Sequence, residues 1–229
     1  MRDLPSTRPA SLAMRSLTLM LALASVLWGA AGLGGAPARA AADSAGVSAA
    51  PQVGQPAPDF SAVDSEGHTR SLAEFKGKTV VLEWTNADCP YTRKHYTSGN
   101  MQAAQQLARE HGVVWLSVIS SAPGTQGYVT GAQADELSRT RHAVPAAVLL
   151  DPAGTMGRAY HAKTTPHLYI IDGQGILKYM GGMDSIATAD IDDIAKAEPY
   201  LKEALLDVVD GKPVAHPVTR PYGCSIKYR

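Results

Sequence analysis

The stretch VVLEWTNADCPYT, residues 80–92, decides the fold. Its first half belongs to the segment TVVLEWT (79–85), which is mostly β-branched and apolar. This is the pattern of a central strand buried on both faces. Cys89 and Pro90 follow, and the chain then takes on helical character. Proline suits the first position of a helix because its missing N–H costs nothing there. The stretch therefore predicts a buried strand that leads through Cys89 into a helix.

The rest of the chain alternates between strand and helix patterns. The stretch 59–72 predicts a short hairpin with Ser65-Glu66-Gly67 as its turn. Further strands are predicted at 113–121, 146–151, 164–172 and 176–182, the last two as a second hairpin. Helices are predicted at 89–96, 98–112, 130–143, 155–162 and 190–211. Ser98 or Asn100 is expected as the cap at a kink, and Pro199 as a first-turn boundary within the last helix. This order predicts an α/β domain in which strand ends and helix starts meet at one edge of the sheet.

Residues 1–40 are predicted to be an export signal. Three arginines precede an apolar stretch, and ARA (38–40) places small residues at the positions typical of a cleavage site. The alternative is a retained membrane anchor, but the strongly apolar part is about 15 residues, short of the ~20 that span a bilayer. We expect a flexible linker at 41–55 and a folded domain at 56–211. The proline-rich tail at 212–229 carries Cys224 and is expected to lie extended over the domain, without secondary structure of its own.

The charges of the chain balance, with 21 Lys+Arg and 21 Asp+Glu. A chain without net charge is a poor match for nucleic acid or for an anionic membrane surface. We therefore expect an exported protein, periplasmic or secreted, with no nucleic-acid partner and no membrane partner once the signal is removed. The oligomeric state stays open. The two cysteines of such a protein most simply form a disulfide.

Cys89 lies where a buried strand feeds a helix, which points to a reactive thiol instead. The free N–H groups and the dipole at a helix N-terminus favour negative charge and lower a cysteine pKa. Arg93 and Lys94, one turn further on, are expected to add positive potential, and Asp88 opposes it.

Two further positions are candidates for the same site. Glu83 is the one charged residue of its strand, and a buried carboxylate needs a partner or a task. It either relays protons to Cys89 or is a strand-end residue that faces solvent. Pro166 opens the strand at 164–172, and in this topology a cis proline there faces the cysteine.

These residues resemble those of the thioredoxin-fold redoxin superfamily. The motif VVLEWTNADCPYT, the late TTP (164–166) before a hairpin and the order of elements all match that fold. The opening stretch 54–84 is similar to peroxiredoxins of the alkyl hydroperoxide reductase/thiol-specific antioxidant type and to their exported relatives. The resemblance spans about residues 53–211. It implies a central mixed sheet flanked by helices, with an N-terminal hairpin extension, a buried acid at Glu83 and a cis-proline loop at Thr165-Pro166.

The sequence also departs from both branches of this superfamily. Peroxiredoxins carry a threonine three residues before the reactive cysteine, where this chain has Asn86. Disulfide oxidoreductases carry a second cysteine where this chain has Thr92, whose hydroxyl can only donate a hydrogen bond to the Cys89 thiolate. The resemblance to two-cysteine peroxiredoxins implies that Cys224 is the resolving cysteine. The alternative is a permanent Cys89–Cys224 disulfide that only stabilises the fold.

Three functions follow from these observations. The first is an exported, peroxiredoxin-like thiol oxidoreductase in which Cys89 attacks a peroxide or a disulfide, Cys224 resolves the product and an external thiol reduces it. The second is a thioredoxin-like disulfide reductase, isomerase or client-trapping protein. The third is a redox-silent binding module. No cofactor is expected. Four histidines could supply metal ligands, His95, His161, His167 and His216, but no metal is expected, because the Cys-x-x-x-Cys pair of copper-binding relatives is absent. Most of these four histidines are expected at the surface or hydrogen-bonded.

Overall fold

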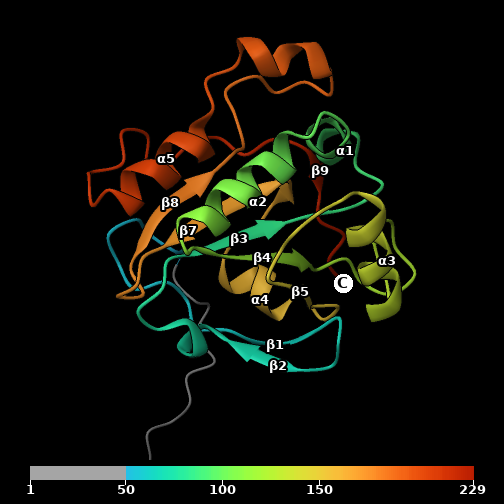
Figure 1. Cartoon of the computed structure of the whole chain (residues 1–229). Helices are drawn as coiled ribbons and strands as arrows, with labels where there is room; N and C mark the ends of the chain where they lie inside the picture. Colours follow the sequence, from blue (N-terminus) through green and yellow to red (C-terminus); the bar gives the residue numbers. More distant parts are fainter. Residues whose placement is uncertain (1–49) are drawn as a thin grey trace, which may run out of the picture. The chain divides into compact units, whose positions relative to one another are not determined.

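The computed structural model describes residues 50–229. The predicted export signal and most of the predicted linker lie outside these residues. A seven-stranded sheet runs through the domain in the order β2-β1-β5-β4-β3-β7-β8 (Figure 1). Its strands are β1 (Ser61–Asp64), β2 (Thr69–Ser71), β3 (Val80–Trp84), β4 (Val114–Ile119), β5 (Ala147–Leu150), β7 (His167–Ile171) and β8 (Leu177–Gly181).

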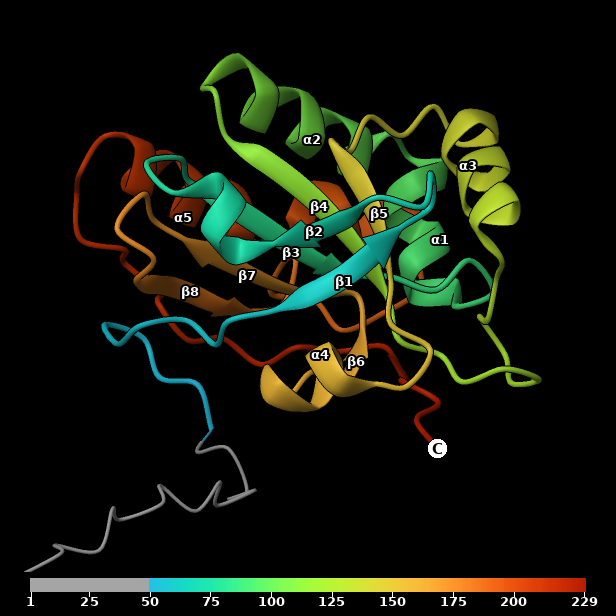
Figure 2. The ribbon, with the colours of Figure 1, turned by 90° about the horizontal axis from the view of Figure 1, so that it is seen from below.

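The sheet is mixed, as predicted. Strands β3, β4 and β5 are parallel, whereas β7 runs antiparallel to β3 and β8 antiparallel to β7. The predicted N-terminal hairpin is β1 and β2, which joins the sheet through an antiparallel pairing of β1 with β5 (Figure 2). The predicted α/β class and the thioredoxin-like arrangement are therefore confirmed.

Helices cover both faces of the sheet and bury β3 completely. The helices are α1 (Pro90–Thr97), α2 (Asn100–Glu110), α3 (Gly131–Thr140), α4 (Thr155–Ala159) and α5 (Tyr200–Val209). On one face, Val81 of β3 belongs to a core shared with α1, α2 and α5. On the other face, Leu82 and Trp84 pack in a core that includes α4. This double burial accounts for the apolar pattern, broken only by Glu83, that predicted a central strand.

Three local predictions need correction. The cap of α2 is Gly99, at φ 77°, and not Ser98 or Asn100, because the tight kink after α1 requires a left-handed conformation that glycine adopts without strain. The single helix predicted at 190–211 is wrong. It is a 3-10 helix, η2 (Ile191–Lys196), followed by α5, and Pro199 separates the two because its ring and missing N–H do not fit a helix interior.

The third correction concerns the predicted strand at 164–172. It divides at a cis Thr165-Pro166 bond into β6 (Thr164–Thr165) and β7. Strand β6 leaves the main sheet and pairs with β9 (Cys224–Ser225) of the tail. The tail lies extended, as predicted, but it has a strand of its own, because β6 offers it an unpaired edge. Within residues 50–229, no helix has the length and apolar character needed to cross a membrane.

Candidate active site

Cys89 is the N-cap residue of α1, as the sequence predicts. Its backbone is extended, and Pro90 occupies the first helical position. Just before it, the Asn86 carboxamide oxygen accepts the Asp88 N–H at 2.8 Å, which shapes the turn between β3 and α1. The Cys89 side chain is fully buried.

The tail brings Cys224 to Cys89. Thr165 of β6 lies opposite Cys224 of β9 in an antiparallel pair. The Cys224 N–H donates to the Cys89 sulfur at 3.4 Å, and as a thiol Cys89 donates to the Thr165 carbonyl at 3.0 Å. Both cysteines are free, and Cys224 is half-buried. Four of the predicted site residues, Cys89, Cys224, Thr165 and Pro166, therefore gather at one place.

The two thiols have opposite tendencies to ionise. Burial opposes ionisation of Cys89, but hydrogen bonds from the Cys224 thiol and from the Thr92 and Cys224 N–H groups outweigh it, so its pKa is lowered. Burial and the neighbouring Cys89 sulfur raise the pKa of Cys224 to about 11. Cys89 therefore ionises more readily than Cys224, and the thiolate is the reactive form of a cysteine.

Glu83 is fully buried, so the solvent-facing alternative is wrong. Its carboxylate accepts hydrogen bonds from four side chains: Tyr96 (3.0 and 3.1 Å), Trp115 (2.9 Å), Ser117 (3.0 Å) and Gln105 (3.4 Å). Burial raises its pKa, and the bonds from Trp115, Tyr96 and Ser117 oppose the rise. These contacts join β3 to β4, α1 and α2. A proton relay from Glu83 to Cys89 stays a prediction.

Thr92 and Lys94 differ from their expected roles. The Thr92 hydroxyl is buried and has no hydrogen-bond partner, so Thr92 acts on Cys89 through its backbone N–H. Lys94 is also buried, and its ammonium lies 3.5 Å from Asp184. Its charge is therefore paired, which removes much of the positive potential expected at the thiol.

Sequence reasoning missed Gly223. Its φ is 140°, and a Cβ at this position would lie 2.0 Å from the Thr165 carbonyl oxygen. Only glycine lets the tail approach the cis-proline loop this closely. A glycine directly before a cysteine in an otherwise stiff, proline-rich tail was the available signal. Within residues 50–229, no group of three or more His, Cys, Asp or Glu side chains gathers in a way that could hold a metal ion.

Comparisons with known proteins agree with this fold. The model of the AhpC/TSA family matches residues 53–180, more than half of the chain. A hypothetical protein from Sinorhizobium meliloti superposes with a TM-score of 0.64 at 21% identity, covering 78% of this chain and 95% of that one. An uncharacterised conserved protein from Geobacillus kaustophilus gives a TM-score of 0.64 at 21% identity, covering 78% and 93%. No curated protein matches the chain significantly.

We predict that Glu83→Gln changes how stability depends on pH. The pKa of Glu83 is higher in the folded protein than in the unfolded chain, where it is near 4.5, so protonation of Glu83 favours the folded state. This contribution to stability is complete below the unfolded pKa and is lost as the pH rises through the folded pKa. The variant cannot titrate, so its unfolding free energy should decline less than that of the parent as the pH rises above about 4.5. Urea unfolding at several pH values measures this. The exposed Glu110→Gln is the control, and parallel pH profiles for parent and Glu83→Gln would contradict the prediction.

We also predict that Gly223→Ala uncovers Cys89. The added methyl group collides with the Thr165 carbonyl, so β9 should separate from β6. Alkylation of Cys89 by iodoacetamide, followed by intact mass, should then accelerate by at least about tenfold. Gly124→Ala is the matched control, because Gly124 also has a positive φ (80°) but has open space around its Cβ position. Equal alkylation rates in the parent and Gly223→Ala would show that the tail does not protect Cys89.

Proposed function

Because the chain belongs to the AhpC/TSA family, we propose that it is a thiol oxidoreductase whose redox couple is Cys89 and Cys224. The observation that carries this proposal is the contact of the Cys224 N–H with the Cys89 sulfur at 3.4 Å. A helix N-terminus and two N–H donors favour the thiolate of Cys89. A second thiol with a raised pKa stands beside it as the partner.

The first step is reduction of a hydroperoxide. The Cys89 thiolate attacks one peroxide oxygen, an S–O bond forms and the O–O bond breaks. The sulfur loses two electrons and becomes a sulfenic acid once protonated, while the leaving oxygen takes a proton and departs as an alcohol or water. The N-terminus of α1 stays beside the reacting sulfur when the tail has moved, and its N–H groups favour the thiolate.

Resolution and reduction complete the cycle. The Cys224 sulfur attacks the sulfenic acid, an S–S bond forms, and water leaves with the Cys224 proton. Two electrons and two protons from an external thiol reductant then return both cysteines to thiols, and the reductant leaves as a disulfide. Thr92 cannot replace Cys224 in this step because it has no sulfur.

Access to Cys89 requires the tail to move. The Cys89 side chain is fully buried, with Cys224 and the Thr165 carbonyl against its sulfur. A substrate therefore reaches the sulfur only when β9 leaves β6. Since this pairing joins just two residues on each strand, it is a short element to open.

A second candidate function is disulfide exchange with another protein. The backbone edge of β6 beside Cys89 here pairs with an extended strand that carries a cysteine. An extended cysteine-containing segment of another chain fits the same edge by strand addition once the tail has moved. In the third function, a Cys89–Cys224 disulfide would only stabilise the fold. Export through residues 1–40 remains part of the proposal, and N-terminal sequencing of secreted protein tests it; Met1 at the N-terminus would count against it.

We predict that Cys224→Ser leaves the first reaction of Cys89 with hydrogen peroxide intact. Without a resolving thiol, the sulfenic acid should persist long enough for a trapping reagent and then gain a second oxygen to become sulfinic acid. Intact-mass spectrometry at low protein concentration measures both products, with Ser225→Ala as the control beside Cys224.

The outcomes separate the three functions. Clean resolution in Cys224→Ser without added thiol would mean that Cys224 is not the partner. Mixed disulfides with a thiol-bearing peptide but no peroxide consumption would favour disulfide exchange. If Cys89 of the parent does not react with peroxide and the Cys224→Ser variant is unfolded, the disulfide is structural.

A further inference from the structure

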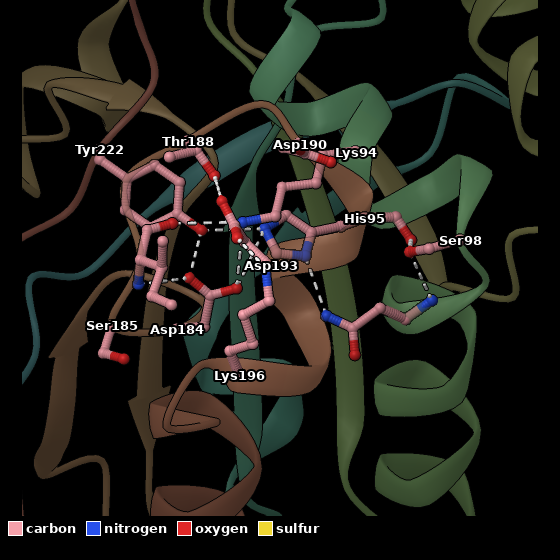
Figure 3. A network of polar contacts seen from close by, with 12 residues as sticks. Lys94, His95, Ser98, Asp184, Ser185, Thr188, Asp190, Asp193, Lys196 and Tyr222 are labelled. Atoms are coloured by element: carbon pink, nitrogen blue, oxygen red, sulfur yellow. Dashed lines mark hydrogen bonds and ion pairs between the residues drawn. The ribbon is translucent and has the colours of Figure 1, made fainter.

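Four polar side chains form a buried cluster that joins α1 to the tail. They come from three separate segments: Lys94 and His95 from α1, Asp184 from the loop after β8, and Tyr222 from the tail (Figure 3). Lys94 and His95 have no exposed side-chain surface, and Asp184 is 4% exposed. Such burial is rare for charged residues unless they are paired, so we call these four residues the anchor cluster and examine what it holds.

Hydrogen bonds and ion pairs connect all four residues. The Tyr222 hydroxyl donates a short hydrogen bond to Asp184 Oδ1 and lies 3.2 Å from His95 Nε2. The Lys94 ammonium lies 3.5 Å from Asp184 Oδ2, and it donates to the Ile186 carbonyl at 3.2 Å. Asp184 Oδ2 has no hydrogen bond, so the carboxylate depends on the Lys94 charge and on the donors to its other oxygen.

The hydrogen bonds around Tyr222 form a chain in which each group donates to the next. The Asn100 amide nitrogen lies 2.9 Å from His95 Nδ1, which then accepts and leaves the imidazole proton on Nε2. His95 Nε2 in turn donates to the Tyr222 oxygen, and the Tyr222 hydroxyl donates to Asp184. Burial lowers the pKa of His95 to about 4, which agrees with a neutral ring. The Tyr222 hydroxyl is thereby held from both sides.

The anchor cluster connects the carriers of the two cysteines. Cys89 caps the helix from which Lys94 and His95 project, and Tyr222 lies two residues before Cys224. Resting on the proposed function, we propose that the anchor cluster positions Cys224 for its reaction with Cys89, with Tyr222 as the positioning residue. The partner of Tyr222 is the buried carboxylate of Asp184, so the hydroxyl has one position of low energy. Loss of this hydrogen bond leaves the buried carboxylate with one donor fewer.

The tail has other anchors, which makes the role of Tyr222 testable. Before Tyr222, the Thr219 hydroxyl accepts the Gly182 N–H at 3.0 Å. Beyond Cys224, the Ile226 N–H donates to the Lys163 carbonyl at 3.0 Å, and the Tyr228 hydroxyl donates to the Ala162 carbonyl at 2.9 Å. Tyr228→Phe therefore removes one hydroxyl anchor from the same tail without touching the anchor cluster.

The experiment measures the equilibrium between the two free thiols and their disulfide in glutathione buffers. Samples are quenched with acid, and their intact mass is determined. For Tyr222→Phe we expect the equilibrium constant for closing the Cys89–Cys224 disulfide to fall by about tenfold, the effect of one hydrogen bond to a charged group. Alkylation of Cys89 in a Cys224→Ser background should rise by about the same factor, because the tail leaves its docked position more often.

Three further variants distinguish positioning of Cys224 from a general loosening of the fold: Asp184→Asn, its combination with Tyr222→Phe, and Tyr228→Phe. Asp184→Asn should also lower the equilibrium constant, because the Tyr222 hydroxyl then donates to a neutral amide oxygen instead of a carboxylate. Its effect should be smaller in a Tyr222→Phe background, where that bond is already absent. Tyr228→Phe should stay within about twofold of the parent. Urea unfolding of the reduced proteins shows whether any change merely follows global stability.

Other results overturn the inference. It fails if Tyr222→Phe closes its disulfide as readily as the parent, or if Tyr228→Phe is equally impaired. It also fails if the parent forms no Cys89–Cys224 disulfide in any glutathione buffer. The readout contains no peroxide step, so a parent that forms the disulfide but does not consume peroxide would refute the peroxidase proposal and leave the positioning role supported.

Discussion

The geometry of the candidate site depends on one backbone pairing, that of Thr165 with Cys224. The pairing is possible because β6 is a strand separate from β7 and has an edge outside the main sheet. A backbone pairing of this kind depends little on most side chains, but it requires the two backbones to lie close together. The chain meets that demand with a glycine at 223. The same pairing places an N–H donor at the Cys89 sulfur, covers that sulfur and supplies the second thiol.

Much of the fold is readable from the sequence because its signals are local. The apolar run of β3 and the strand-to-helix change at Cys89 both follow from residues close together in the chain. The error in the helix at 190–211 arose because an amphipathic pattern continued across Pro199, while the backbone could not. The error in the strand at 164–172 had another cause. A strand pattern does not tell whether a proline interrupts one strand or separates two that join different sheets.

The candidate site also has residues that the sequence predicts and residues that it does not. Cys89, Thr165 and Pro166 carry motif signals, and they lie where the resemblance implied. The anchor cluster carries none. Tyr222 and Asp184 are 38 positions apart, and Lys94 is of a residue type that is rarely buried. Only the three-dimensional path of the tail brings these side chains together. The sequence also does not predict that the Thr92 hydroxyl lacks a partner, because hydrogen-bond geometry cannot be derived from residue type alone.

The long separation between the cysteines also affects the order in which the chain is made. Cys89 and Cys224 are 135 positions apart, and β9 is the last strand to be synthesised. The sheet strands, and helices α1 to α5, all precede it, so they can begin to pack while the segment that covers Cys89 is still missing. During biosynthesis the Cys89 thiol therefore passes through a period without its cover and without its partner thiol. A chain that ends after α5 and before β9 contains all strands of the main sheet but lacks the strand that covers Cys89, and the surrounding redox conditions then decide what happens to its sulfur.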